Sequence, residues 1–146
     1  MRTYAPVGEP TEPGGREASL SRWLETLARE LQDQGGADFA HAERMMEAIR
    51  LTKRELASRL GVDPRTLGRF RERGRLNPMA SDRLYRLARL FEAAIELHQD
   101  EAQAARWLKT PNQALGGVCP MDMIATEPDF EQVMNLLGAL KEGVFV

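Results

Sequence analysis

The chain has 146 residues, of which 42% are hydrophobic and 29% are charged, as in an ordinary globular protein. No apolar run approaches the roughly 18 residues of a membrane span, and the first residues lack the apolar stretch of a signal peptide. We therefore expect a cytoplasmic protein with no membrane partner. The single cysteine, Cys119, excludes an internal disulfide, and two distant histidines offer no zinc-ligand spacing, so no metal or other cofactor is predicted.

The net charge of −2 conceals an uneven distribution along the chain. Residues 1–49 carry 5 basic and 9 acidic side chains, residues 50–90 carry 12 and 4, and residues 91–146 carry 3 and 9. A surface that is merely solvated mixes its charges, whereas a basic block between acidic flanks is typical of a nucleic-acid-binding surface. The charge pattern therefore favours DNA as a partner of the central block.

A tail and two helices are expected before the basic block. Residues 1–18 are rich in Pro, Gly and Glu without periodicity, which predicts a flexible tail. Apolar side chains then recur at helical spacing over residues 20–31, so a helix is expected there, ending at Gly35-Gly36. Asp38 is a suitable N-cap for a second helix, which leads into the basic block.

Three helices separated by loops are expected after residue 75. Proline and glycine residues mark the loops, and apolar side chains at helical spacing mark the helices. The expected features are a turn at Asn77-Pro78, a long helix capped by Ser81 or Asp82, a helix from about Asp100 to Pro111, loops with one helical turn at 121–124, and a last helix from Asp129 to Gly143. No run alternates for long enough to form a strand, so the predicted fold class is all-α.

Residues 52–75 have the pattern of a helix-turn-helix. Thr52 and Glu55 form a capping box at the start of a short helix, and Gly61 provides the turn because glycine tolerates positive φ. Asp63 and Pro64 then suit the N-cap and first position of a second helix. In this motif the second helix lies in the major groove of DNA, so we expect residues 52–75 to read double-stranded operator DNA.

The candidate DNA contacts follow from the exposed positions of the second helix. Arg65 and Arg69 share one face and are assigned to base readout, because a guanidinium binds guanine through two parallel hydrogen bonds. Thr66 is expected to add a base contact, and Gly68 to let the helix backbone approach the duplex. The residues assigned to phosphates are Lys53, Arg71, Arg73 and Arg75. The alternative is an αα-hairpin whose arginines only solvate one face.

The downstream sequence resembles a known family. The helix-turn-helix resembles the Xre type. The run Ala105–Gly117 (ARWLKTPNQALGG), followed by Pro120–Ile124 (PMDMI), Val133–Leu137 and Gly143–Phe145, is similar to the C-terminal domain of Xre/MbcA/ParS antitoxins. The resemblance covers roughly residues 35–146. It implies a helical DNA-binding domain at 19–98, after the tail at 1–18, and a small toxin-binding domain at 99–146.

The resemblance implies an antitoxin of a type II toxin–antitoxin pair that represses its own operon. Its partner would be a RES-domain toxin that consumes NAD⁺, and the segment Lys141–Val146 would block the toxin's NAD⁺ cleft. The apolar end of that segment could equally pack into the protein's own core. The implied toxin-binding residues are Trp107, Pro111, Asn112, Leu115, Gly116, Gly117, Pro120, Lys141, Glu142, Gly143, Val144, Phe145 and Val146.

A stand-alone Xre-type repressor is the alternative function, with a C-terminal lobe used for dimerisation or ligand sensing. Both functions suggest a homodimer, because two-fold symmetry combines two half-site contacts on a palindromic operator. An enzyme is not expected, since the sequence shows no cluster of nucleophile, base or metal ligands and hence no catalytic residues. Cys119 has no nearby histidine or basic residue that would activate it, and it is interpreted as a packed thiol.

Overall fold

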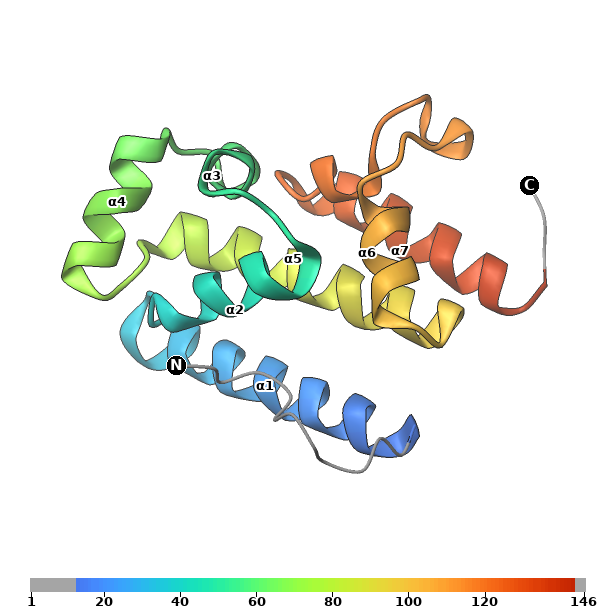
Figure 1. Ribbon diagram of the computed structural model, residues 1–146, viewed down its shortest axis with the longest axis horizontal. Coiled ribbons are helices and arrows are strands. Elements are labelled where there is room, and N and C mark those ends of the chain that lie inside the picture. The colour runs from blue at the N-terminus through green and yellow to red at the C-terminus, as the bar shows by residue number, and fades with distance from the viewer. Residues whose placement is uncertain (1–12, 144–146) are drawn as a thin grey trace. The chain divides into compact units, whose positions relative to one another are not determined.

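The computed structural model describes the backbone of residues 13–143 and the side chains of residues 19–143. Within that range it contains seven α-helices, two short 3-10 helices and no strand, which confirms the all-α prediction (Figure 1). The elements in order are α1 (Pro13–Gln34), α2 (Ala40–Ile49), α3 (Lys53–Leu60), α4 (Pro64–Arg73), α5 (Pro78–His98), α6 (Glu101–Leu108), η1 (Gln113–Leu115), η2 (Pro120–Asp122) and α7 (Glu127–Lys141).

The chain divides into two compact units, Met1–Tyr85 and Arg86–Val146. We call them the N-terminal unit and the C-terminal unit. The division falls within α5, whereas the domain boundary predicted from the sequence lies at the end of that helix. Each unit buries its own apolar side chains, so one half of α5 contributes to each core.

The first helix starts earlier than the sequence predicts. Residues 13–18, which were assigned to the flexible tail, belong to α1, and residues 1–12 lie outside the described residues. Proline at the start of a helix loses no intrahelical hydrogen bond, and extending a helix that already exists costs far less than nucleating one. The buried face of α1 therefore supports a helix that composition alone did not indicate.

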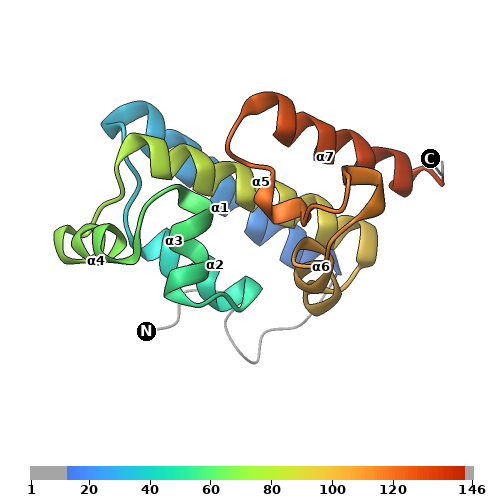
Figure 2. The same ribbon diagram turned by 90° about the horizontal axis from the view of Figure 1, so that it is seen from above.

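The core of the N-terminal unit joins the five helices of that unit around fully buried leucines, alanines and methionine. Its members include Leu27 from α1, Met45 from α2, Leu56, Ala57 and Leu60 from α3, Leu67 from α4, and Ala80 and Leu84 from α5. Figure 1 looks along the axis of α3 while α4 lies across the view, and Figure 2 reverses this, so the two helices cross steeply. That crossing leaves one side of α4 exposed.

The C-terminal unit is organised by α5 and α7, which run side by side in the same direction. Three polar contacts in sequence order align them: Arg86 with Glu127 at 3.5 Å, Arg89 over the Phe130 ring at 5.2 Å, and Lys141 with Glu96 at 2.9 Å. The buried members of this core include Leu87, Phe91, Ala94, Ala104, Leu108, Met121, Ile124, Val133 and Leu137.

Two helix starts differ from the sequence prediction by about one turn. Helix α5 begins at Pro78 rather than after Ser81 or Asp82, and the Asn77 side chain accepts the Ala80 N–H at 2.8 Å. Proline is favoured at the first helical position, so the residue interpreted as a turn marker is the helix start.

The last helix follows the same rule. Helix α7 begins at Glu127 rather than at Asp129, because Thr126 is the N-cap and accepts the Asp129 N–H at 3.3 Å. Pro128 lies in the first turn, where its missing N–H costs nothing.

Candidate functional site

The first helix of the helix-turn-helix is fixed at its start by a reciprocal capping box. The Thr52 hydroxyl accepts the Glu55 N–H at 3.1 Å, and the Glu55 carboxylate accepts the Thr52 N–H at 2.8 Å. These are the two bonds that the sequence predicts. They satisfy backbone donors that would otherwise lack partners, so the orientation of α3 is set locally.

The backbone conformation of the turn between α3 and α4 favours glycine. Gly61 has φ +78°, a left-handed conformation that residues with side chains rarely adopt. A Cβ at this position would lie 2.1 Å from a guanidinium nitrogen of Arg83 of α5, so the flexible end of that arginine would have to move. Arg83 was not identified from the sequence as part of the motif, because only the tertiary fold brings α5 against this turn.

Helix α4 begins with the cap that the sequence predicts. The Asp63 carboxylate accepts the Thr66 N–H at 2.7 Å, and Pro64 occupies the first turn. The pKa of Asp63 is lowered, first by this backbone hydrogen bond and then by a side-chain hydrogen bond from Thr66, with smaller contributions from the charges of Arg65 and Arg69. The carboxylate therefore remains ionised at neutral pH, and its negative charge interacts favourably with the positive end of the helix dipole.

The outer face of α4 presents the two arginines assigned to base readout. Leu67 and Phe70 are buried, with 0% and 3% of their surface exposed, as the sequence predicts. Arg65 and Arg69 are exposed on the opposite side, and neither forms an ion pair with a carboxylate in the described part of the chain. Thr66 is half-buried next to them. The arrangement leaves both guanidinium groups available to a ligand.

The cations assigned to phosphates have different surroundings. Arg71 forms an exposed ion pair with Glu43 of α2, at 3.7 Å between Nε and Oε2. The Arg73 guanidinium lies 5.4 Å from the centre of the Phe70 ring, and both arginines remain exposed. Exposed pairs of this kind are weak, so either side chain is free to exchange its partner for a phosphate at little cost.

Arg75 has a structural partner. Its guanidinium donates to the Gly36 carbonyl at 2.7 Å, and the backbone of Arg75 pairs with Asp38 in an isolated antiparallel bridge. A phosphate contact by Arg75 would have to share or break the bond to Gly36. The distance in sequence between Arg75 and Gly36 explains why this contact was not foreseen.

Gly68 makes room for a lysine. A Cβ at Gly68 would lie 3.3 Å from the ammonium nitrogen of Lys53, which reaches across from the first turn of α3. The surface beside Gly68, where the helix backbone was expected to approach the duplex, is thus partly filled by a cation. Lys53 and Gly68 together place a positive charge on the side of α4 next to Arg65 and Arg69.

Two exposed charged residues belong to this surface and were not singled out from the sequence. Arg54 follows Lys53 in the first turn of α3, and Glu72 lies three residues after Arg69 on α4. Helical spacing places Glu72 on the same face as Arg69 and could have indicated it. Its negative charge opposes phosphate contact at the C-terminal end of α4.

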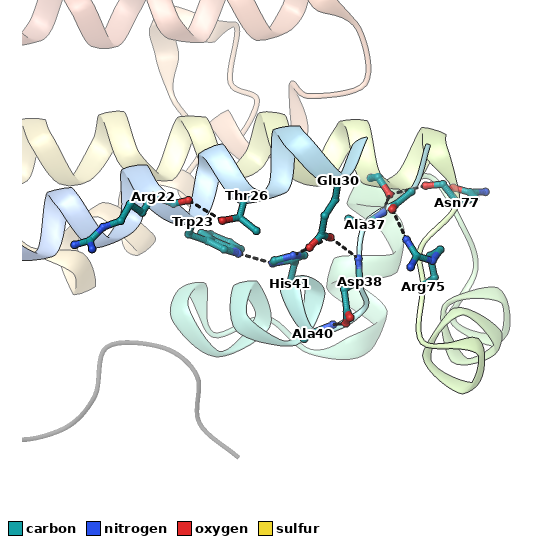
Figure 3. A network of polar contacts seen from close by, with 12 residues as sticks. Arg22, Trp23, Thr26, Glu30, Ala37, Asp38, Ala40, His41, Arg75 and Asn77 are labelled. Carbon is teal, nitrogen blue, oxygen red and sulfur yellow. Dashed lines mark hydrogen bonds and ion pairs between the residues drawn. The ribbon is translucent and has the colours of Figure 1, made fainter. Parts of the chain in front are cut away.

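A polar junction fastens the end of α4 to the α1–α2 turn (Figure 3). The Leu76 N–H donates to the Ala37 carbonyl at 2.9 Å, and the Phe39 N–H donates to the Gly74 carbonyl at 3.0 Å. Ser81 is fully buried, and its hydroxyl accepts the Ala37 N–H at 2.8 Å. Helix α4 is therefore held at both ends by hydrogen bonds.

The same turn is tied to the long first helix. Glu30 of α1 accepts the Asp38 N–H at 2.9 Å and lies 3.1 Å from Nε2 of His41 (Figure 3). The Trp23 indole N–H donates to Nδ1 of the same histidine, and the Arg44 guanidinium lies 4.5 Å from the centre of a Trp23 ring. These contacts order α1 against α2.

The residues implied for toxin binding separate into a buried and an exposed set. Leu115 and Pro120 are buried, Trp107 is half-buried with its ring 6.1 Å from that of His98, and the Asn112 side chain accepts the Ala114 N–H at 2.9 Å. These four residues form the scaffold of the loop. The exposed set comprises Pro111, Gly116, Gly117, Lys141, Glu142 and Gly143, while Val144, Phe145 and Val146 lie outside the described residues.

The remaining chemistry of the surface is limited in the described part of the chain. Over residues 19–143, no group of three or more His, Cys, Asp or Glu side chains could hold a metal ion. Cys119 is half-buried, and its thiol donates to the Lys109 carbonyl at 3.3 Å. None of the described helices is long and apolar enough to cross a membrane.

These features define a helix-turn-helix protein with a second helical unit. A family model described as the antitoxin Xre-like helix-turn-helix domain matches residues 28–89, and one described as the antitoxin Xre/MbcA/ParS C-terminal toxin-binding domain matches residues 93–143. The first match ends and the second begins within α5. The first match includes α3 and α4, and the second covers most of the C-terminal unit. Both family models describe domains of antitoxins.

Individual relatives agree with both matches. The chain is 35% identical to the antitoxin Xre of Yersinia enterocolitica over 97 residues, 65% of this chain and 66% of that protein. It is 36% identical to the antitoxin Xre of Photorhabdus laumondii over 73 residues, which span 49% of each. It is 31% identical to the mycobacterial cidal antitoxin MbcA of Mycobacterium tuberculosis over 104 residues, 69% of this chain and 88% of that protein. The chain belongs to the Xre/MbcA/ParS antitoxin family.

Proposed function

We propose that the chain is the antitoxin of a type II toxin–antitoxin pair, that it neutralises a RES-domain toxin which consumes NAD⁺, and that it represses its own operon. The observation that carries the proposal is the combination, in one chain of this family, of a helix-turn-helix with two exposed arginines on one face of α4 and a unit that matches a toxin-binding domain. The RES identity of the toxin rests on the sequence resemblance.

The DNA-binding part of the proposal assigns roles by position. Arg65 and Arg69 read base edges in the major groove, with Thr66 beside them, because they share the exposed face of α4 and form no ion pair with a carboxylate among the described residues. Lys53, Arg71 and Arg73 contact phosphates and supply affinity. The main role of Arg75 is structural, since its guanidinium donates to the Gly36 carbonyl and so links the segment after α4 to the α1–α2 turn.

Two copies of the chain would bind a palindromic operator. A dimer combines two half-site contacts and raises the effective concentration of the second helix-turn-helix near its half-site. The C-terminal unit is then the part that holds the toxin, through the exposed residues near Gly116 and the segment from Lys141 onward. Neutralisation follows if that segment occupies the NAD⁺ cleft of the toxin.

Co-expression with the protein encoded next to this chain tests the proposal. We expect the two proteins to co-purify, and cellular NAD⁺ to fall when the neighbour is expressed alone and to recover with the pair. The absence of both a complex and an effect on NAD⁺ would contradict the antitoxin function. Operator binding that persists in that case would favour the stand-alone repressor.

A further inference from the structure

One loop of the C-terminal unit is closed on itself by hydrogen bonds. The Asn112 carbonyl accepts the N–H groups of Leu115 at 3.0 Å and Gly117 at 2.8 Å, and the Asn112 N–H donates to the Val118 carbonyl at 3.1 Å. Leu115 is buried beneath the loop, with 5% of its surface exposed. A loop that is closed and anchored in this way loses little conformational entropy when a partner binds it.

The loop and its flanks carry no charge. No Asp, Glu, Lys or Arg occurs from Thr110 to Met121, although 29% of the whole chain is charged. Thr110, Pro111, Gln113, Ala114, Gly116, Gly117 and Val118 in this segment are exposed. The centre of a protein–protein interface is depleted of charged residues, whereas ordinary exposed surface is not. We call residues 110–121 the uncharged loop.

An apolar side chain stands out from this loop. Val118 is 41% exposed and, with Met79 at 46%, is one of two large hydrophobic side chains exposed in the described part of the chain. Gly116 and Gly117 precede it with φ +71° and +86°, and a Cβ at either would meet nothing within 4 Å. A partner backbone can therefore approach the loop closely beside Val118.

We propose that Val118 is the apolar centre of the surface by which the uncharged loop docks on the toxin. This inference rests on the proposed antitoxin function. It assigns to the toxin an uncharged, apolar depression that accepts Val118, and it separates the docking residues from Leu115 and Pro120, which only hold the loop in shape. The match of residues 93–143 to a toxin-binding domain supports the toxin, rather than another protein, as the occupant.

Affinity of the purified toxin for full-length variants tests the docking surface. Val118→Asp should weaken the complex by at least about tenfold, because docking would bury a carboxylate without a partner. Val118→Ala should weaken it less. Met79→Asp is the matched control, since it places the same charge on the other exposed apolar side chain and should leave toxin affinity unchanged.

Three results would overturn the inference. Equal toxin affinity of the wild type and Val118→Asp would exclude the docking role while leaving the antitoxin function intact. A changed oligomeric state of Val118→Asp without toxin would identify the loop as a contact between copies of this chain. Failure of the wild type to bind the toxin would refute the proposed function together with the docking surface. Circular dichroism and operator binding of Val118→Asp check that the variant remains folded.

Discussion

Helix α4 and the uncharged loop are both exposed and both held in place by hydrogen bonds, yet their compositions are opposite. Four of the ten residues of α4 are arginines, whereas residues 110–121 contain no charged residue. Rigid backbone therefore does not distinguish the two surfaces. The difference in charge indicates two kinds of partner: a polyanion for the N-terminal unit and a protein surface that excludes water for the C-terminal unit.

The largest expected effect is that of salt concentration, which should weaken operator binding far more than toxin binding. If Lys53, Arg71 and Arg73 contact phosphates in each half of a dimer, operator affinity should fall roughly a thousandfold between about 50 and 200 mM salt, because counterions are released on binding. Toxin affinity should change far less, because the uncharged loop has no charge to screen and only Lys141 and Glu142 among the proposed toxin contacts are charged. Fluorescence anisotropy for DNA and calorimetry for the toxin measure both. A toxin complex as salt-sensitive as the DNA complex would contradict the comparison.

The junction at the end of α4 should be intolerant of a single methyl group. A Cβ at Gly36 would lie 2.3 Å from the Leu76 carbonyl oxygen, so Gly36→Ala forces the backbone apart. We expect the free energy of unfolding to fall by about 2–3 kcal/mol, measured by chemical denaturation.

Gly138→Ala in α7 is the matched control for that variant. A Cβ at Gly138 meets nothing within 4 Å, and alanine is the better helix former, so stability should rise by up to about 1 kcal/mol. Equal effects of the two variants would show that the junction is not a tight contact.

Base readout is the next largest expected effect. Arg69→Ala should cost about 1–3 kcal/mol in operator affinity and relax selectivity at one base pair if its contact is bidentate. Arg106→Ala removes an exposed arginine from α6 and should leave operator affinity nearly unchanged. Anisotropy titrations against the operator and single-base variants measure both. If Arg69→Ala kept the affinity and selectivity of the wild type, the placement of α4 in the major groove would be contradicted.

The helix caps of the two units allow a smaller, paired test. Thr52 takes part in a reciprocal box at 3.1 and 2.8 Å, whereas Thr126 accepts one N–H at 3.3 Å. Thr52→Ala should therefore lower the free energy of unfolding by about 1 kcal/mol, and Thr126→Ala by about 0.5 kcal/mol. Thermal denaturation of both variants is the measurement, and a larger loss for Thr126→Ala would contradict the ranking.

The smallest expected effect is the pH dependence of the Asp63 cap. Because its pKa is lowered in the folded state, Asp63 contributes stability fully above its ordinary value of 3.8 and loses it as the pH falls through the lowered pKa. Asp63→Asn keeps an N-cap residue that does not titrate. Denaturation between pH 3 and 7 should therefore show a smaller loss at low pH for the variant. If the free energies of unfolding of the two proteins changed in parallel with pH, Asp63 would not contribute to the pH dependence of stability.

Local signals made the helix-turn-helix predictable, and tertiary contacts decided the rest. The caps at Thr52 and Asp63 depend on residues three positions away, so spacing alone identified them. Asn77 and Ser81 can both cap a helix start, and they lie about one turn apart. The structure uses Asn77 as the cap, whereas the Ser81 hydroxyl accepts the N–H of Ala37, 44 residues away.

Contacts between residues that are distant in sequence also explain why two of the candidate sites were only partly predicted. Arg75 has the composition of a phosphate contact, but its guanidinium binds a carbonyl 39 residues away. In the run that carries the family resemblance, the matching residues include the buried Leu115 and Pro120, whereas Val118 could not be predicted because a single valine has no pattern. The sequence located the loop, and only the fold showed which of its side chains are exposed.

The nearness of Lys53 to Gly68 couples two helices in the placement of one charge. A methyl group at position 68 would lie 3.3 Å from the lysine ammonium, so the flexible end of the lysine would have to shift by a few tenths of an ångström. A larger side chain at position 68 would require a larger shift. The size of residue 68 on α4 therefore tunes where a cation from α3 lies on the surface, without any change in the number of charges.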